Sequence, residues 1–135
     1  MPARRDTTPE PDAERHPFAY DGLDRTIHEK ARLGILACLL GHPQGLLFTE
    51  LKDFCGLTDG NLSRHLQVLE EAGLIDVWKG YKGKKPQTLC RLTDLGKRRF
   101  QEYLRLLEGI VADALTASRA GSPAAGKPRE GLQPT

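Results

Sequence analysis

The stretch Thr58-Asp-Gly-Asn-Leu-Ser-Arg-His-Leu-Gln-Val-Leu-Glu-Glu-Ala-Gly-Leu74 is the most informative part of this sequence. Thr58 can cap a helix, and Asp59 in the first turn suits the positive end of the helix dipole. Small polar and basic side chains occupy one side of this helix, and apolar side chains recur at helical spacing on the other, with His65 beside them: Leu62, Leu66 and Leu69. The pattern predicts a helix with one face in a core and the other free to contact the edges of DNA bases.

Two shorter helices are predicted before this one. The first starts at a capping box, Thr26-Ile-His-Glu29, and carries an apolar stripe from Ile27 to Leu40 before Gly41-His42-Pro43 ends it. Leu46 to Phe48 is then a short extended piece. The second helix is predicted from a Thr49 cap to Cys55, with Leu51 and Phe54 pointing inward and Gly56 ending it in a left-handed conformation.

A hairpin and a long helix are predicted after it. Residues 74–78 and 87–92 read as two strands joined by a Gly- and Lys-rich turn over residues 80–86. Thr93 caps a last helix that extends to about Ala117, longer than so small a core requires. The sequence therefore predicts a mainly α fold with a small β-hairpin, in the order of a winged helix-turn-helix with a long C-terminal helix.

The outward side chains of this arrangement suit DNA. Asn and Gln can make bidentate hydrogen bonds with adenine, and Arg can do so with guanine. Gly60 lets the helix start lie close to a phosphate. The predicted DNA-binding residues of the recognition helix are Thr58, Gly60, Asn61, Ser63, Arg64 and Gln67. Lys82, Lys84 and Lys85 at the tip of the wing are predicted to contact the DNA backbone, which fixes register without reading much sequence.

Composition sets limits on this interpretation. The 135 residues suffice for one domain with tails, and the net charge of +2 alone does not indicate nucleic acid, but the basic residues concentrate between Lys79 and Arg105. Residues 1–22 and 118–135 are rich in Pro, Gly and charge and are predicted to be disordered around a domain at 23–117. With no apolar run of spanning length and no signal peptide, a cytoplasmic protein without membrane contact is expected.

Residues 23–108 resemble the winged-helix transcriptional regulators of the MarR/ArsR type. The similarity lies in four segments: Leu57–Leu74, with its Leu-Thr-x-Gly-Asn-Leu start, and His28–Leu36, Lys82–Pro86 and Leu92–Gly96. The resemblance implies sequence-specific binding to double-stranded DNA as a homodimer, with the first and last helices paired across a two-fold axis. The interface is then expected to include the following apolar side chains: Ile27, Phe100, Tyr103, Leu104, Leu107, Ile110 and Val111.

Other functions have less support in the residues. No nucleophile-base pair or phosphate-binding loop is present, so no enzyme and no cofactor are expected. ArsR-type metal sensing would need paired thiols, but Cys55 has no second cysteine close in sequence, so no metal site is predicted. Redox control through Cys38, Cys55 or Cys90 stays open. The main alternative is a winged-helix protein-interaction module. A repressor that blocks a promoter is favoured over an activator, because no additional interaction surface is evident; the effector is unknown.

Overall fold

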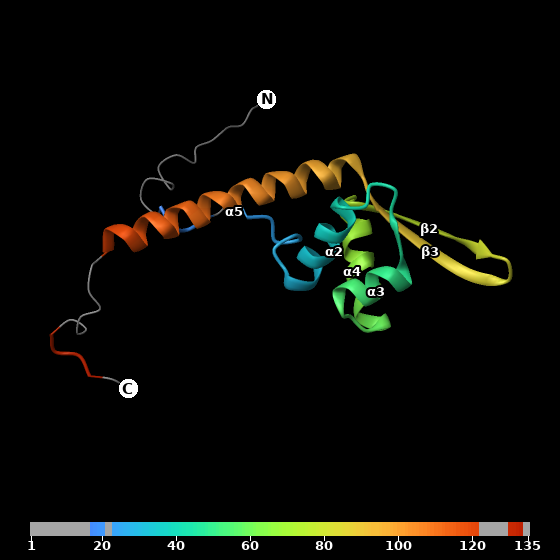
Figure 1. Cartoon of the computed structure of the whole chain (residues 1–135), viewed down its shortest axis with the longest axis horizontal. Helices are drawn as coiled ribbons and strands as arrows, with labels where there is room; N and C mark the ends of the chain where they lie inside the picture. The colour runs from blue at the N-terminus through green and yellow to red at the C-terminus, as the bar shows by residue number, and fades with distance from the viewer. Residues whose placement is uncertain (1–16, 21–22, 122–129, 134–135) are drawn as a thin grey trace, which may run out of the picture.

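The computed structural model describes residues 17–20, 23–121 and 130–133, so most of the two predicted tails lies outside the described residues. Among the described residues, three helices precede a hairpin and a long last helix (Figure 1). The elements in chain order are α2 (Lys30–Leu40), β1 (Leu46–Leu47), α3 (Phe48–Cys55), α4 (Asp59–Glu71), β2 (Ile75–Lys82), β3 (Lys85–Leu92) and α5 (Asp94–Gly121). The predicted fold class, a mainly helical winged helix with a long C-terminal helix, is confirmed.

The sheet is larger than the predicted hairpin. Its strand order is β1-β3-β2, all antiparallel, with Leu46 opposite Cys90 at the β1 edge. The β2–β3 ladder continues out to the pair Lys82–Lys85, so the turn is shorter than the predicted 80–86. Gly83 has a φ of 64°, and this left-handed conformation allows a tight turn of two residues. The wing is therefore a long ribbon with lysines at its tip.

Two predicted helix starts were wrong by one to a few residues. Helix α2 begins at Lys30 and not at Thr26, because the Asp24 side chain accepts a hydrogen bond from Thr26 N (2.9 Å) and holds the preceding residues in a turn. Glu29 caps α2 instead. Helix α3 begins at Phe48, one residue before the predicted Thr49 cap, and Glu50 accepts a hydrogen bond from Leu47 N at 2.8 Å. In both cases a carboxylate satisfies a free backbone amide.

The core lies between α2, α3, α4, the sheet and the first part of α5. Most of its side chains were predicted to point inward, but Phe54 is 60% exposed and stacks on His42, which corrects the prediction that it points into the core. The buried apolar side chains are Ile27, Ile35, Leu36, Leu39, Leu46, Leu51, Leu62, Leu66, Leu69, Leu74, Ile75, Cys90, Phe100 and Tyr103. Helices α2, α3 and α4 thus all contribute to one continuous core.

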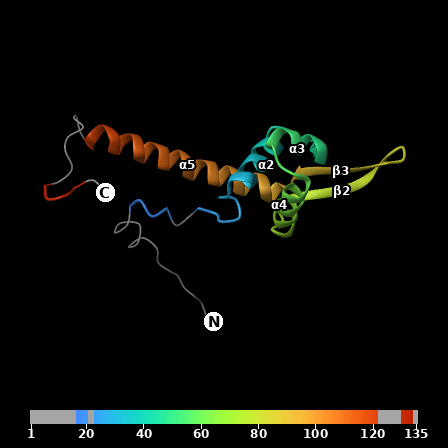
Figure 2. The same ribbon diagram turned by 90° about the horizontal axis from the view of Figure 1, so that it is seen from below.

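Helix α5 is fixed at its start and leaves the body at its end. The predicted Thr93 cap is present: Thr93 Oγ1 accepts a hydrogen bond from Gly96 N (2.9 Å) and donates one to the Gly73 carbonyl (2.7 Å). Gly96 packs so close to the Leu74 carbonyl oxygen that an added Cβ would lie 2.0 Å from it. The helix then runs to Gly121, past the predicted end, and projects away from the body opposite to the wing (Figures 1 and 2). No helix in the described ranges is long and apolar enough to cross a membrane.

Candidate nucleic-acid interface

Helix α4 has the two faces that the sequence predicts. Leu62, Leu66 and Leu69 are buried, as is His65. All six predicted recognition-helix residues are exposed on the opposite side: Thr58, Gly60, Asn61, Ser63, Arg64 and Gln67. The structure therefore gathers these side chains on one free surface, and the whole apolar side of the helix is used inside the chain.

The turn before α4 orients the helix. Gly56 ends α3 with a φ of 64°, a left-handed conformation that glycine adopts without strain. Thr58 Oγ1 accepts a hydrogen bond from Asn61 N at 3.2 Å, which is the predicted cap. Nζ of Lys52 in α3 lies 2.9 Å from Oδ1 of Asp59 in α4, and this carboxylate raises the pKa of Lys52. Because the pair is exposed, it contributes little to the free energy of unfolding and mainly helps to orient α4 relative to α3.

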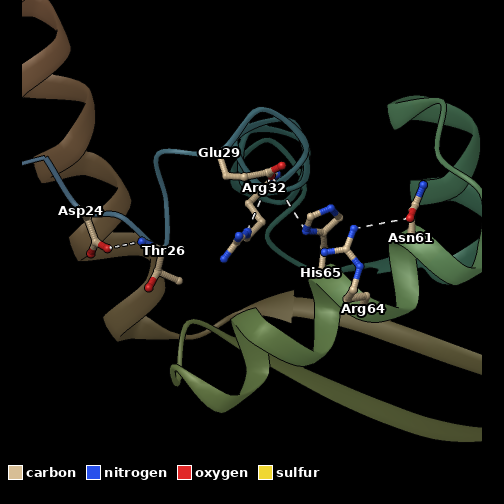
Figure 3. Close-up of polar contacts among 7 residues, drawn as sticks. All are labelled: Asp24, Thr26, Glu29, Arg32, Asn61, Arg64 and His65. Atoms are coloured by element: carbon tan, nitrogen blue, oxygen red, sulfur yellow. Dashed lines mark hydrogen bonds and ion pairs between the residues drawn. The ribbon is translucent and has the colours of Figure 1, made fainter.

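The candidate base-reading side chains contact each other in the free chain. Arg64 Nη2 donates to Asn61 Oδ1 at 3.5 Å, so both side chains extend to the same side of the helix (Figure 3). One turn later Gln67 Nε2 donates to Glu71 Oε2 at 3.3 Å. These long, exposed hydrogen bonds are weak and can be exchanged for bonds to bases. The two hydrogen bonds thus join exposed polar side chains of α4 in pairs along one side of the helix.

The wing, formed by β2 and β3, has positively charged side chains at the tip that lies far from the core. Lys82, Lys84 and Lys85 are all exposed at its tip. Farther back, Arg91 lies over the Trp78 ring, 5.7 Å from its centroid. Figure 1 shows the ribbon extending from the same part of the body that carries α4. The extended ladder gives these lysines reach toward a phosphate backbone.

A groove of about 400 Å³ separates α4 from the wing. The sequence pattern did not indicate it, although alternation along β2 places Val77 and Lys79 on one side of the strand. The groove brings Ser63, Gln67 and Glu70 of α4 together with Lys79 of β2. Lys79 therefore adds a positive charge beside the exposed polar face of α4, and Glu70 adds a negative one.

The start of α2 contacts the buried side of α4. His65 is 4% exposed, and its Nδ1 lies 3.9 Å from Glu29 Oε1. Burial lowers the pKa of His65, and Glu29 acts in the opposite direction. Glu29 also accepts a hydrogen bond from Arg32 N at 3.0 Å, and this bond lowers the pKa of Glu29. Sequence spacing gave no signal for this contact, because Glu29 and His65 are 36 positions apart.

Two cysteines that are distant in sequence meet between α2 and α3. Cys38 and Cys55 line one cavity, and Cys55 Sγ lies 3.9 Å from the position of an added Cβ on Gly34, one turn before Cys38. Cys55 has no second cysteine close in sequence, but the fold brings the Cys38 thiol next to it. Burial, followed by the Cys38 thiol, raises the pKa of Cys55 to about 11. Within the described ranges, no group of three or more His, Cys, Asp or Glu side chains could hold a metal ion.

The predicted interface residues divide into two groups. Ile27, Phe100 and Tyr103 are at most 2% exposed and pack inside the core of a single chain. The remaining four, which lie farther along α5, are partly or fully exposed: Leu104, Leu107, Ile110 and Val111. Leu106 and Leu115 are also about half exposed, at 44% and 52%. The projecting part of α5 therefore carries exposed apolar side chains, as does the wing, where Trp78 and Tyr81 are exposed.

Comparison with known proteins matches residues 31–111 to the family described as winged helix DNA-binding domain. An uncharacterized protein of Methanocaldococcus jannaschii is 37% identical over 80 residues, which cover 59% of this chain and 86% of that protein.

Solved structures show the same fold. A transcriptional regulator homologue from Pyrococcus horikoshii OT3 is 28% identical, with a TM-score of 0.63 over 67% of this chain and 89% of that one. The heme sensor protein PefR from Streptococcus agalactiae, solved with heme, is similar in fold alone, with 18% identity and a TM-score of 0.59 over 78% of this chain and 72% of its own. The family match spans more than half of the chain, from α2 into α5, and includes every element of the candidate interface: the chain belongs to the winged helix DNA-binding domain family.

Proposed function

We propose that this protein is a transcriptional repressor that binds a pseudo-palindromic operator as a homodimer. The observation that carries the proposal is the exposed face of α4, where Asn61, Arg64 and Gln67 lie together beside a lysine-tipped wing. Asn and Gln recognise adenine and Arg recognises guanine in the major groove, while the wing lysines bind the backbone. The similarity to a transcriptional regulator homologue supports the regulatory role.

The same face argues against a protein-interaction module. No large apolar side chain is exposed on α4, whose free side is formed by glycine and polar or charged residues. Protein interfaces usually need a buried apolar or aromatic centre. Polar hydrogen-bonding groups with a basic ribbon beside them are typical of a DNA interface instead.

The projecting part of α5 supports the dimer. Tyr103, Leu107, Ile110, Ala114 and Ala117 follow one another at alternating spacings of four and three residues, which is the repeat of a helix-helix seam. Leu107 still packs partly against the chain's own core, whereas Ala114 and Ala117 are exposed. A second copy related by a two-fold axis would bury it and would set two recognition helices about 34 Å apart, on successive major-groove faces.

The experiment that tests this function is selection of bound sequences from a random double-stranded DNA pool. We expect enrichment of two inverted half-sites with centres about 10 base pairs apart. A single asymmetric site would contradict the dimer. No enrichment together with salt-sensitive binding to all DNA would contradict sequence recognition.

Two variants distinguish the residues that recognise bases from those that contact the DNA backbone, with binding measured on the selected site. Arg64→Ala should cost about 1–3 kcal/mol and relax specificity at one base pair of each half-site. Lys84→Ala with Lys85→Ala should weaken binding to all sequences alike and reduce the log–log salt slope by about 0.9 for each phosphate that the wing no longer neutralises. Glu108→Ala on α5 is the matched control, because it is exposed but lies far from the recognition surface along the chain. Unchanged selectivity in Arg64→Ala would place the reading face elsewhere.

A further inference from the structure

His65 is the one buried polar side chain in the described part of the chain, and it lies on the recognition helix. Its Nδ1 has no hydrogen-bond partner there, and neither does Nε of the neighbouring Arg32. Buried polar atoms in native proteins are usually paired, so an unpaired imidazole nitrogen behind a DNA-reading surface needs a reason.

Both unpaired nitrogens face the same oxygen. Arg32 Nε lies 3.7 Å and His65 Nδ1 lies 3.9 Å from Glu29 Oε1, just beyond hydrogen-bond distance (Figure 3). That oxygen already caps α2 by accepting from Arg32 N. Its position is therefore fixed by the helix start. A shift of the imidazole by less than about 1 Å would complete a hydrogen bond between α4 and the cap of α2.

The surroundings allow a proton to reach this contact. Glu29 and His65 border a cavity of about 570 Å³ that opens between α2, α3 and α4. The other charged or titratable groups facing it are Lys30, Cys38, Cys55 and Arg64, with Arg32 beside Glu29. The Cys55 thiol stays neutral near physiological pH because burial raises its pKa to about 11. Glu29 is thus the nearby anion, and the other fixed charges are cations.

We propose that Glu29 and His65 form a proton-linked positioning pair, in which protonated His65 donates from Nδ1 to Glu29 and so fixes the recognition helix to the start of α2. DNA then favours the protonated form. Arg64, the residue just before His65, disfavours a second positive charge in the free chain. A phosphate or base on Arg64 would offset that effect, and by reciprocity the protonated protein binds DNA more tightly. This DNA linkage rests on the proposed function, whereas the pair itself does not.

The pair is tested without DNA, by NMR titration of His65 in the full chain. Glu29→Gln removes the charge but keeps a side-chain oxygen that can accept from Arg32 N, so the cap of α2 is retained. The pKa of His65 should fall in Glu29→Gln, because the carboxylate that favours the imidazolium is gone. Glu50→Gln is the matched control: Glu50 accepts from the backbone at the start of α3, and its loss should leave His65 unchanged. Equal His65 titrations in wild type and Glu29→Gln would overturn the pair.

The DNA linkage is tested by measuring affinity for the selected operator between pH 8 and 5.5 at constant salt. Wild-type affinity should rise as pH falls, by at most about tenfold per pH unit for each proton taken up, which is about a hundredfold for a dimer with two copies of His65. His65→Gln should show a shallower dependence, and Glu29→Gln should move the dependence to lower pH. Titration calorimetry in two buffers of different ionisation enthalpy should show greater proton uptake by wild type than by His65→Gln.

The outcomes distinguish the two proposals. Parallel pH profiles for wild type and His65→Gln would overturn the linkage while leaving DNA binding intact. If His65→Gln lost the same affinity at every pH, His65 would act only through packing and the proton linkage would be contradicted. No binding of the wild type to any DNA at any pH would overturn the proposed function and the linkage with it, and the NMR titration would still decide the pair.

Discussion

Helices α4 and α5 are both amphipathic, but they use their apolar faces differently. The 13 residues of α4 bury Leu62, His65, Leu66 and Leu69 within the chain. The 28 residues of α5 bury only Gly96, Phe100 and Tyr103, all in its first ten positions. What α4 leaves exposed is polar, and what α5 leaves exposed farther along includes Leu106, Val111 and Leu115. The apolar face of α4 is therefore buried within the chain, whereas we expect the apolar face of α5 to be fully buried only by a partner.

The largest expected effect comes from removing a core leucine of α4. Leu69→Ala should lower the free energy of unfolding by about 2–5 kcal/mol, because Leu69 is fully buried. Ile110→Ala on α5 should change the unfolding of dilute, monomeric protein far less. Urea unfolding at low and high protein concentration measures both. Equal losses for the two variants at low concentration would remove the distinction between the helices.

The next effect concerns association. Ile110→Glu should shift the chain strongly toward monomer, since it places a charge in the seam that we propose a second copy covers. Ala112→Glu adds the same charge two residues away, on the opposite, exposed side of α5, and should leave association unchanged. Sedimentation across a concentration series gives the dissociation constants. Similar behaviour of the two variants would show that this seam is not the interface.

The helix caps give a smaller contrast. Thr58→Ala removes a single bond to Asn61 N and should cost about 1 kcal/mol. Thr93→Ala loses the bond from Gly96 N and also the one to the Gly73 carbonyl, so it should cost more, by about another 1 kcal/mol. Thr93→Ser keeps the hydroxyl and should restore most of that loss. Thermal unfolding of the three variants checks this order, and equal costs for Thr58→Ala and Thr93→Ala would show that only the first-turn amide matters.

The smallest effect is a dependence of stability on pH. Burial lowers the pKa of His65 below its ordinary value of 6.5, so the unfolded chain binds a proton at this site more readily than the folded chain does. The contribution of neutral His65 to stability is complete above pH 6.5 and decreases as pH falls through that value toward the folded pKa. Urea unfolding at pH 7.5 and 5.5 should show this decrease in wild type and a smaller one in His65→Gln. Identical decreases would indicate that other groups cause it.

Much of the interface could be predicted from sequence because its signals are local. The helix cap predicts where α4 starts, and a known start fixes the direction of each side chain. The helical period then predicts that Leu62, Leu66 and Leu69 point inward. It predicts that Asn61, Arg64 and Gln67 point outward. The same reasoning gave a wrong prediction for Phe54, which does not point into the core. Its position matched an apolar stripe, but in the last turn of α3 it is Cys55 that packs against the core, and Phe54 stacks on His42 at the surface.

The sequence by itself determined the order of the elements, the two faces of α4 and the basic wing, because each depends on residues within a few positions of one another. Only the tertiary structure decided which apolar residues of α5 are used within the chain, that Cys38 meets Cys55, and that Glu29 faces His65. The two cysteines are 17 positions apart in sequence, and Glu29 and His65 are 36 positions apart. No local pattern encodes such distances; they follow from how the helices cross when they bury a shared core.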